Sequence, residues 1–102
     1  MRVISRKRLL EFSDAHPAAV RPLVEWYAKA TAARWSSFPQ VKQTFAQTDQ
    51  ARVASGNTVA IFDIGGNKFR LIAAIHYKAQ IVYVLRILTH RECDRTTWKE
   101  QL

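Results

Sequence analysis

The feature that most constrains the fold is a series of three apolar runs in the second half of the chain. They cover Thr58–Ile64, Lys68–Tyr77 and Ile81–Thr89 and are rich in Ile, Val and Leu. Only Gly65-Gly66-Asn67 and Lys78-Ala79-Gln80 separate them. A connection this short cannot make a parallel crossover, so we expect three antiparallel strands in a meander. The two glycines supply the positive φ that a tight hairpin turn needs.

The first half of the chain predicts a short strand followed by two helices. Arg2-Val3-Ile4 predicts the strand, and Ser5 is a suitable N-cap for a helix from Arg6 to about Ser13. His16-Pro17 predicts the start of a second helix that ends near Arg34. Apolar spacing along this helix predicts one buried stripe, made of Val20, Leu23, Val24, Tyr27, Thr31 and Trp35. The two helices form a hairpin with an apolar side.

The remaining segments complete an α+β domain that spans residues 1–102. Val41–Phe45 fits a further helical turn, whereas Gln47–Asn57 is polar and predicts a loop. Arg91–Gln101 is polar around Trp98 and predicts a last helix over the sheet. The expected architecture is therefore a helical hairpin packed on one face of a small antiparallel sheet.

The charge balance indicates an anionic partner. Sixteen Lys and Arg face eight Asp and Glu, which gives a formal net charge of +8. Such an excess favours nucleic acid, an anionic membrane surface or an acidic protein. No apolar run approaches the roughly 20 residues of a membrane helix, and the amino terminus lacks a secretory signal's apolar stretch. One cysteine excludes an internal disulfide, so we expect a cytoplasmic protein.

Alternation along the strands predicts where the cations lie. In the second strand of the meander, Arg70 falls on the less apolar face, because the opposite set is bulkier and faces the helices. In the last strand, Arg86 and His90 are in phase with Val82, Val84 and Leu88. If this register holds, Arg70, Arg86 and His90 converge on one concave patch.

Two motifs together resemble HigB-type toxins, which are RelE-like components of bacterial toxin–antitoxin pairs. They are Gly-Gly-Asn-Lys-Phe-Arg, ending at Arg70, and Thr-His-Arg-Glu-Cys-Asp, beginning at Thr89. The resemblance covers roughly Ser5 to Asp94. It implies a small α+β endoribonuclease that cuts ribosome-bound messenger RNA without a metal ion or other cofactor. It also implies neutralisation by a helix-turn-helix antitoxin of the HigA type, and no membrane partner.

The resemblance places Arg70, His90 and Cys93 in the active-site region. RNA cleavage needs a base, an acid and cations that stabilise the charge on phosphorus. Arg70 can bind phosphate through two N–H groups, and the same reasoning applies to Arg86. The alternative for Arg70 is an ordinary surface arginine or an ion pair with Glu92 or Asp94. His90 can act as acid, base or phosphate ligand, and its alternative is a structural role at the strand end.

Cys93 is the departure from the family pattern, which has Tyr at this position. A thiol offers neither a ring for stacking nor a strong hydrogen-bond donor, so activity is expected to be reduced. This keeps open a catalytically impaired module that binds RNA or the antitoxin. A third possibility is a basic domain that binds an acidic protein. The expected electrostatic footprint on RNA consists of Lys68, Arg91, Arg6, Lys7, Lys42 and Arg52.

Overall fold

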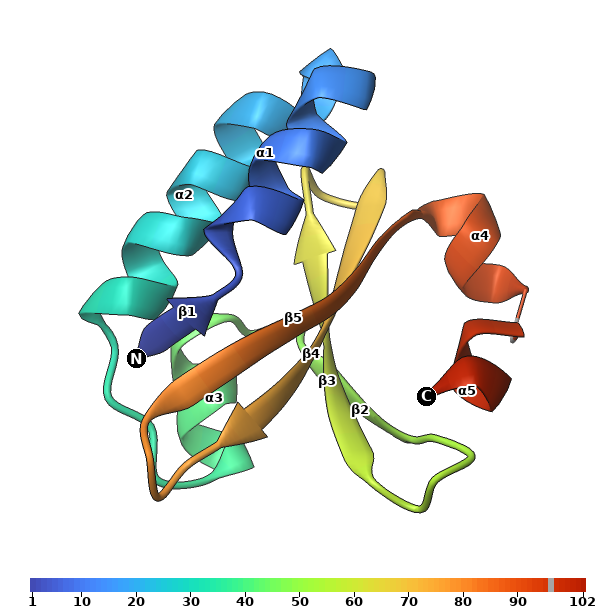
Figure 1. Ribbon diagram of the computed structural model, residues 1–102. Coiled ribbons are helices and arrows are strands. Elements are labelled where there is room, and N and C mark those ends of the chain that lie inside the picture. The colour runs from blue at the N-terminus through green and yellow to red at the C-terminus, as the bar shows by residue number, and fades with distance from the viewer. Residues whose placement is uncertain (96) are drawn as a thin grey trace.

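The computed structural model describes residues 1–95 and 97–102, which form a mixed sheet with helices on both faces (Figure 1). None of the described helices is long and apolar enough to cross a bilayer. The elements in chain order are β1 (Arg2–Ile4), α1 (Arg6–Ala15), the 3-10 turn η1 (Pro17–Ala19), α2 (Val20–Ala32), α3 (Phe38–Thr44), β2 (Asp49–Arg52), β3 (Thr58–Ile64), β4 (Phe69–His76), β5 (Ile81–Thr89), α4 (His90–Asp94) and α5 (Thr97–Gln101).

The sheet has the strand order β1-β5-β4-β3-β2. The predicted meander is confirmed, because β3, β4 and β5 are antiparallel neighbours. The predicted opening strand is confirmed as well, but β1 runs parallel to β5 and makes the sheet mixed. The α+β class therefore holds, while the expectation of a purely antiparallel sheet does not.

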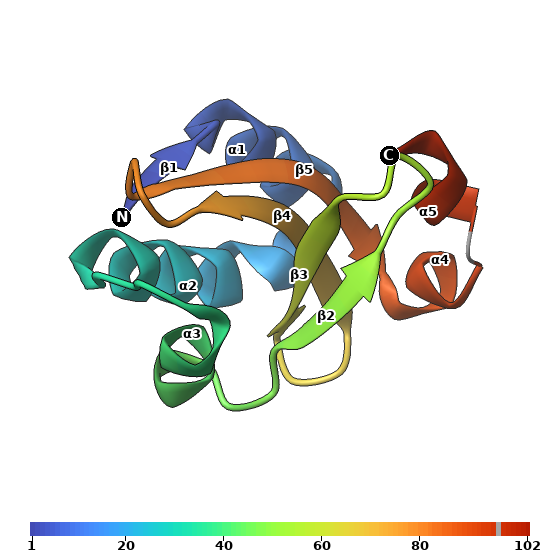
Figure 2. The same ribbon diagram turned by 90° about the horizontal axis from the view of Figure 1, so that it is seen from below.

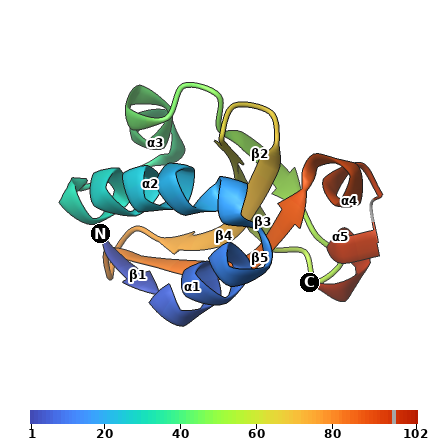
Figure 3. The same ribbon diagram turned by 90° about the horizontal axis from the view of Figure 1, so that it is seen from above.

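Each face of the sheet has its own apolar core. α1, α2 and α3 cover one face, where Trp26 and Leu23 meet Phe62 and Leu71 (Figure 2). The short helices α4 and α5 lie across the other face (Figure 3). There the buried residues are Val53, Val59, Ile72 and Trp98. The predicted carboxy-terminal helix thus exists as two short helices, and Trp98 fastens them to the sheet.

The predicted buried stripe of α2 is confirmed at Leu23 and Trp35 but is wrong at Val20 and Val24. The buried residues of the helix are Leu23, Trp26 and Ala30, whereas Val20 and Val24 are exposed. The indole of Trp26 stacks edge-on against Phe62, with ring centroids 5.3 Å apart. Burying the indole of Trp26 removes more apolar surface from water than burying either valine, so Trp26 orients the helix together with Leu23 and Ala30.

The segment predicted as a loop before the meander contains the edge strand β2. It pairs with β3 from Asp49 opposite Ile61 to Arg52 opposite Thr58. Its side chains are mostly exposed, so no apolar alternation marks it in the sequence. Backbone hydrogen bonds to β3 define this strand, and these depend on the neighbouring strand rather than on local composition.

The turn between β3 and β4 is one residue longer than predicted. Ile64 pairs with Phe69, which leaves four residues in the turn and places Asp63 opposite Arg70. Gly65 and Gly66 have φ of 66° and 70°, as the hairpin turn was expected to require.

A bulge in β5 changes the predicted phase of the last strand. Ala73 pairs with Val84 but Ile72 pairs with Arg86, so Leu85 is an extra residue. Val82 and Val84 pack in the core under the helical hairpin, whereas Leu88 packs on the opposite face. Arg86 therefore does not share a face with the two valines, contrary to the simple alternation.

Candidate active site

Arg70 is held firmly on the face of β4 that α4 covers. Its Nε lies 3.2 Å from Oδ1 of Asp63, the residue opposite on β3. Its two terminal nitrogens donate to the side-chain oxygen of Asn67 and to the carbonyl of Phe69. Only 13% of the Arg70 side chain is exposed, so the expectation of an open surface position is wrong. Its carboxylate partner is Asp63 rather than Glu92 or Asp94.

Cys93 lies in α4 and packs against the core around Ile72 and Trp98. Its carbonyl accepts a hydrogen bond of 3.0 Å from the indole N–H of Trp98. Burial raises the pKa of the Cys93 thiol, and the nearby positive charge of Arg70 opposes that rise. At neutral pH the side chain is therefore a neutral thiol beside the Arg70 guanidinium.

His90 begins α4 at the end of β5. Its backbone N–H donates to the carbonyl of Lys68 (3.0 Å), and its Nε2 lies 3.3 Å from Oδ2 of Asp94. Its Nδ1 is buried and has no hydrogen-bond partner within the described part of the chain. The imidazole is 43% exposed, so one edge of the ring remains accessible to a ligand.

A capping box fixes the start of α4. The Thr89 hydroxyl accepts from the backbone N–H of Glu92 (3.2 Å), and the Glu92 carboxylate accepts from the backbone N–H of Thr89 (3.0 Å). The hydrogen bond from the Thr89 backbone is the largest cause of a lowered pKa at Glu92. This reciprocal cap holds His90 and Cys93 in place relative to β4.

Arg86 lies opposite Ile72 and therefore on the same face of the sheet as Arg70, as predicted, but its side chain turns towards α1. Arg86 lines a groove against α1 with Arg8 and Phe12, and its Nη1 donates to the carbonyl of Leu85 (2.8 Å). Arg8 donates to the same carbonyl (3.1 Å). The structure therefore gathers Arg70, Asp63, Cys93 and His90 at one end of β4, and we call these four residues the Arg70 cluster.

Of the six cations in the expected RNA footprint, two lie beside this cluster. Lys68 is exposed in the turn before β4, and Arg91 is exposed on α4. The other four are dispersed. Lys7 pairs with Glu11 on α1, Arg6 lies over the ring of Tyr27, Lys42 is on α3, and Arg52 is on β2.

Sequence reasoning missed Asp63 and Asn67 as the partners of Arg70. The signal that could have found Asp63 was the hairpin register, since a four-residue turn places it opposite Arg70. Sequence reasoning also missed Lys99, whose positive charge acts on the Cys93 thiol and which lies over the Trp98 ring.

The α+β architecture, with a helical hairpin on one face of the sheet and the Arg70 cluster on the other, is consistent with the RelE-like fold. Residues 19–96 match the model of the HigB toxin family, described as the RelE-like toxic component of a toxin–antitoxin system. The chain therefore belongs to the HigB toxin family, and the resemblance of its motifs is confirmed.

The curated relatives carry related names. The chain is 24% identical over 94 residues to the mRNA interferase toxin HigB of Escherichia coli (strain K12), an alignment that covers 92% of this chain and 88% of that protein. The mRNA interferases HigB of Escherichia coli O157:H7 and Shigella flexneri match with the same identity and coverage.

Proposed function

We propose that the chain is the endoribonuclease of a toxin–antitoxin pair and that its substrate is messenger RNA. Membership of the HigB toxin family and relatives named mRNA interferases support this function. The observation that carries it is the Arg70 guanidinium, held by Asp63 and Asn67 beside accessible cations. A fixed guanidinium is a strong ligand for a phosphodiester.

The proposed chemistry is attack of a ribose 2′-oxygen on the adjacent phosphorus. The P–O bond to the 5′-oxygen breaks, which leaves a cyclic phosphate and a free 5′-hydroxyl. Arg70 stabilises the negative charge that develops on the phosphate oxygens. His90 exchanges a proton with the reacting oxygens, and Asp94 orients its ring. Lys68 and Arg91 hold the flanking phosphates. The reaction as proposed needs no metal ion or other cofactor.

The proposed setting is the bacterial cytoplasm. There the substrate is messenger RNA bound to the ribosome, and the inhibitor is a helix-turn-helix antitoxin of the HigA type. The excess of positive charge supports a polyanionic partner such as ribosome-bound RNA.

Cleavage of a labelled transcript, in translation extract and in EDTA buffer, tests this function. We expect His90→Gln to lower the rate roughly a hundredfold and Arg70→Lys to lower it about tenfold or more. Arg86→Gln and Lys42→Gln are the matched controls outside the cluster and should cleave like the parent. Binding should also weaken steeply as salt is raised. Full activity in both cluster variants would contradict the proposal.

A second candidate is a module that binds RNA or the antitoxin without cutting. Cys93 favours it, because this position is Tyr in the family pattern and the thiol here is neutral and half-buried. RNA that is bound in a salt-dependent way but remains intact with every translation extract would support this candidate over the nuclease.

A further inference from the structure

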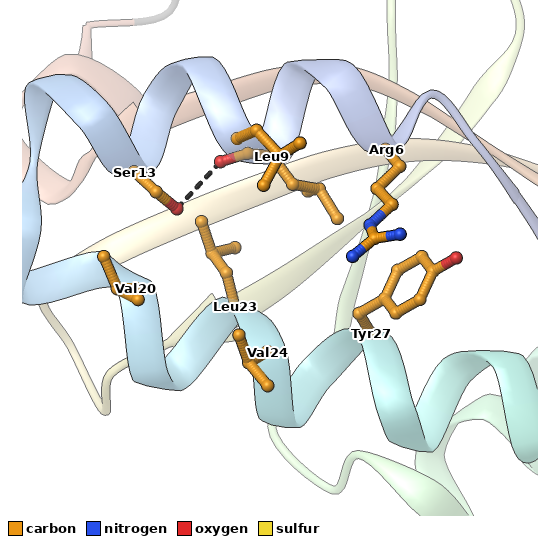
Figure 4. Close-up of a pocket in the computed structure, with 8 residues that line it drawn as sticks. Arg6, Leu9, Ser13, Val20, Leu23, Val24 and Tyr27 are labelled. Atoms are coloured by element: carbon orange, nitrogen blue, oxygen red, sulfur yellow. Dashed lines mark hydrogen bonds between the residues drawn. The ribbon is translucent and has the colours of Figure 1, made fainter.

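The hairpin of α1 and α2 carries a groove on the side that faces away from the sheet. The groove encloses about 110 Å³ between the two helices (Figure 4). Leu9 and Leu10 line it from α1, and Val20, Leu23 and Val24 line it from α2. Its walls are almost entirely apolar, which is unusual for a surface exposed to water.

Exposed apolar side chains gather at this groove. Among the described residues, Leu10, Val20 and Val24 are the large hydrophobic side chains that are exposed, at 55%, 45% and 63%. All three line the same groove. They come from both helices and form one continuous patch. A patch of this kind marks an interaction surface rather than scattered exposure.

The two apolar stripes of α2 explain why the patch exists. Leu23, Trp26 and Ala30 face the sheet and account for the packing of the helix. Val20 and Val24 contribute nothing to that core, since they point into the groove. A polar residue at either position would leave the fold intact, so a partner that covers the groove accounts for the second stripe.

Charge indicates what the partner carries. Three cations begin α1, and two of them have partners: Lys7 pairs with Glu11, and Arg8 donates to the Leu85 carbonyl. Arg6 lines the groove with its guanidinium 5.6 Å from the centre of the Tyr27 ring, and within the described chain it has no carboxylate partner. An occupant with an apolar face and a carboxylate at the Arg6 end complements this groove.

We propose that the α1–α2 groove is the docking site for an acidic, amphipathic helix of the cognate antitoxin. A helix is the shape that fits between two packed helices, with residues at i, i+3 and i+7 reaching the apolar walls. The proposal rests on the proposed function, because it assigns a surface to the antitoxin of that pair. The groove and the Arg70 cluster lie on different faces of the sheet, so each can be changed separately.

The test measures binding of the purified cognate antitoxin. We expect Val24→Asp to weaken binding about thirtyfold and Arg6→Glu about tenfold, as for residues central to an interface. Ala32→Asp, at the exposed end of α2, and Lys7→Glu, beside Arg6, make the same changes in charge outside the groove. These controls should stay within about threefold of the parent. Thermal unfolding of each variant checks its fold.

Transcript cleavage by the same proteins separates the two proposals. If the parent cleaves RNA while Val24→Asp and Arg6→Glu bind the antitoxin as the parent does, the docking site is wrong and the nuclease stands. If the groove variants lose the antitoxin but the parent leaves RNA intact, the docking site stands and the nuclease is wrong. A parent that does not bind the antitoxin overturns the docking site. Loss of self-association or of RNA binding in Val24→Asp, with antitoxin binding unchanged, also overturns it.

Discussion

Removing the carboxylate of Asp63 should both destabilise the fold and release Arg70. The pair is partly buried, with 13% of the Arg70 side chain and 26% of the Asp63 side chain exposed. Exposed pairs contribute about 0–1 kcal/mol, whereas breaking a buried pair costs about 3–5 kcal/mol. Arg70 keeps its bonds to Asn67 and Phe69, so we expect Asp63→Ala to cost about 2 kcal/mol.

This loss corresponds to a fall of roughly 10 °C in Tm for a domain of this size. Asp63→Asn keeps an acceptor oxygen opposite Arg70 and should lower Tm by about half as much. Differential scanning calorimetry measures Tm. Transcript cleavage, assayed well below the lower Tm, measures whether the released guanidinium still acts. We expect cleavage by Asp63→Ala to fall about tenfold, because Arg70 is no longer fixed.

The cost of breaking the Asp63–Arg70 pair also changes how Arg70 itself must be tested. Arg70→Ala leaves the Asp63 carboxylate without its cation, so loss of toxicity alone would not identify a catalytic role. Arg70→Lys retains the charge and is the cleaner change. If Asp63→Ala has the same Tm and the same cleavage rate as the parent, Asn67 alone is enough to hold Arg70 and the reasoning is refuted. Lower stability with full activity would limit Asp63 to a structural role.

Four further predictions concern α4 and α5. The pKa of Glu92 is lower in the folded protein than in the unfolded chain, where it is about 4.3. Its carboxylate therefore stabilises the fold above the unfolded pKa, and this stabilisation is lost as the pH falls through the folded pKa. Calorimetry of Glu92→Gln should therefore show a lower Tm than the parent at pH 7 and a smaller difference near pH 3; a constant difference would contradict the cap. Because burial raises the pKa of Cys93, iodoacetamide should alkylate it about tenfold more slowly than free cysteine at pH 7. The variant Cys93→Tyr should cleave RNA faster than the parent, and equal cleavage rates would mean that this position has a structural role. Trp98→Ala should lower the free energy of unfolding, measured in urea, by about 3–5 kcal/mol, since Trp98 is only 4% exposed. A loss below about 1 kcal/mol would mean that the packing of α5 against the sheet does not stabilise the fold.

The sequence predicted elements that carry their own apolar signal. Thr58–Ile64 and Ile81–Thr89 were predicted with the bounds that the structure has, because each strand carries apolar side chains that pack in a core. β2 was missed, since its exposed side chains carry no such signal and only its pairing with β3 defines it. The stripe of α2 was misassigned because spacing alone cannot rank Trp26 above Val24.

The candidate site was predictable in part, for the same physical reason. The positions of Arg70 and His90 follow from strand ends and motifs, which are local in sequence. The partner of Arg70 depends on a turn that is one residue longer than predicted, so Asp63 was not identified. The raised pKa of Cys93 depends on burial against the core around Trp98, which is a tertiary property.

The bulge at Leu85 decides which face of the sheet carries Arg86. Without it, Arg86 would be in phase with Val82 and Val84 and would enter the core beneath the hairpin, where a guanidinium cannot be buried unpaired. The extra residue turns Arg86 away from that core, and its side chain reaches the edge of β5 beside Arg8. The spacing of Arg86 from Val82 and Val84 in the sequence therefore already indicated that the strand is not regular. The same bulge places Arg86 opposite Ile72, on the face of the sheet that carries Arg70, and the path of its side chain towards α1 keeps its guanidinium out of the Arg70 cluster.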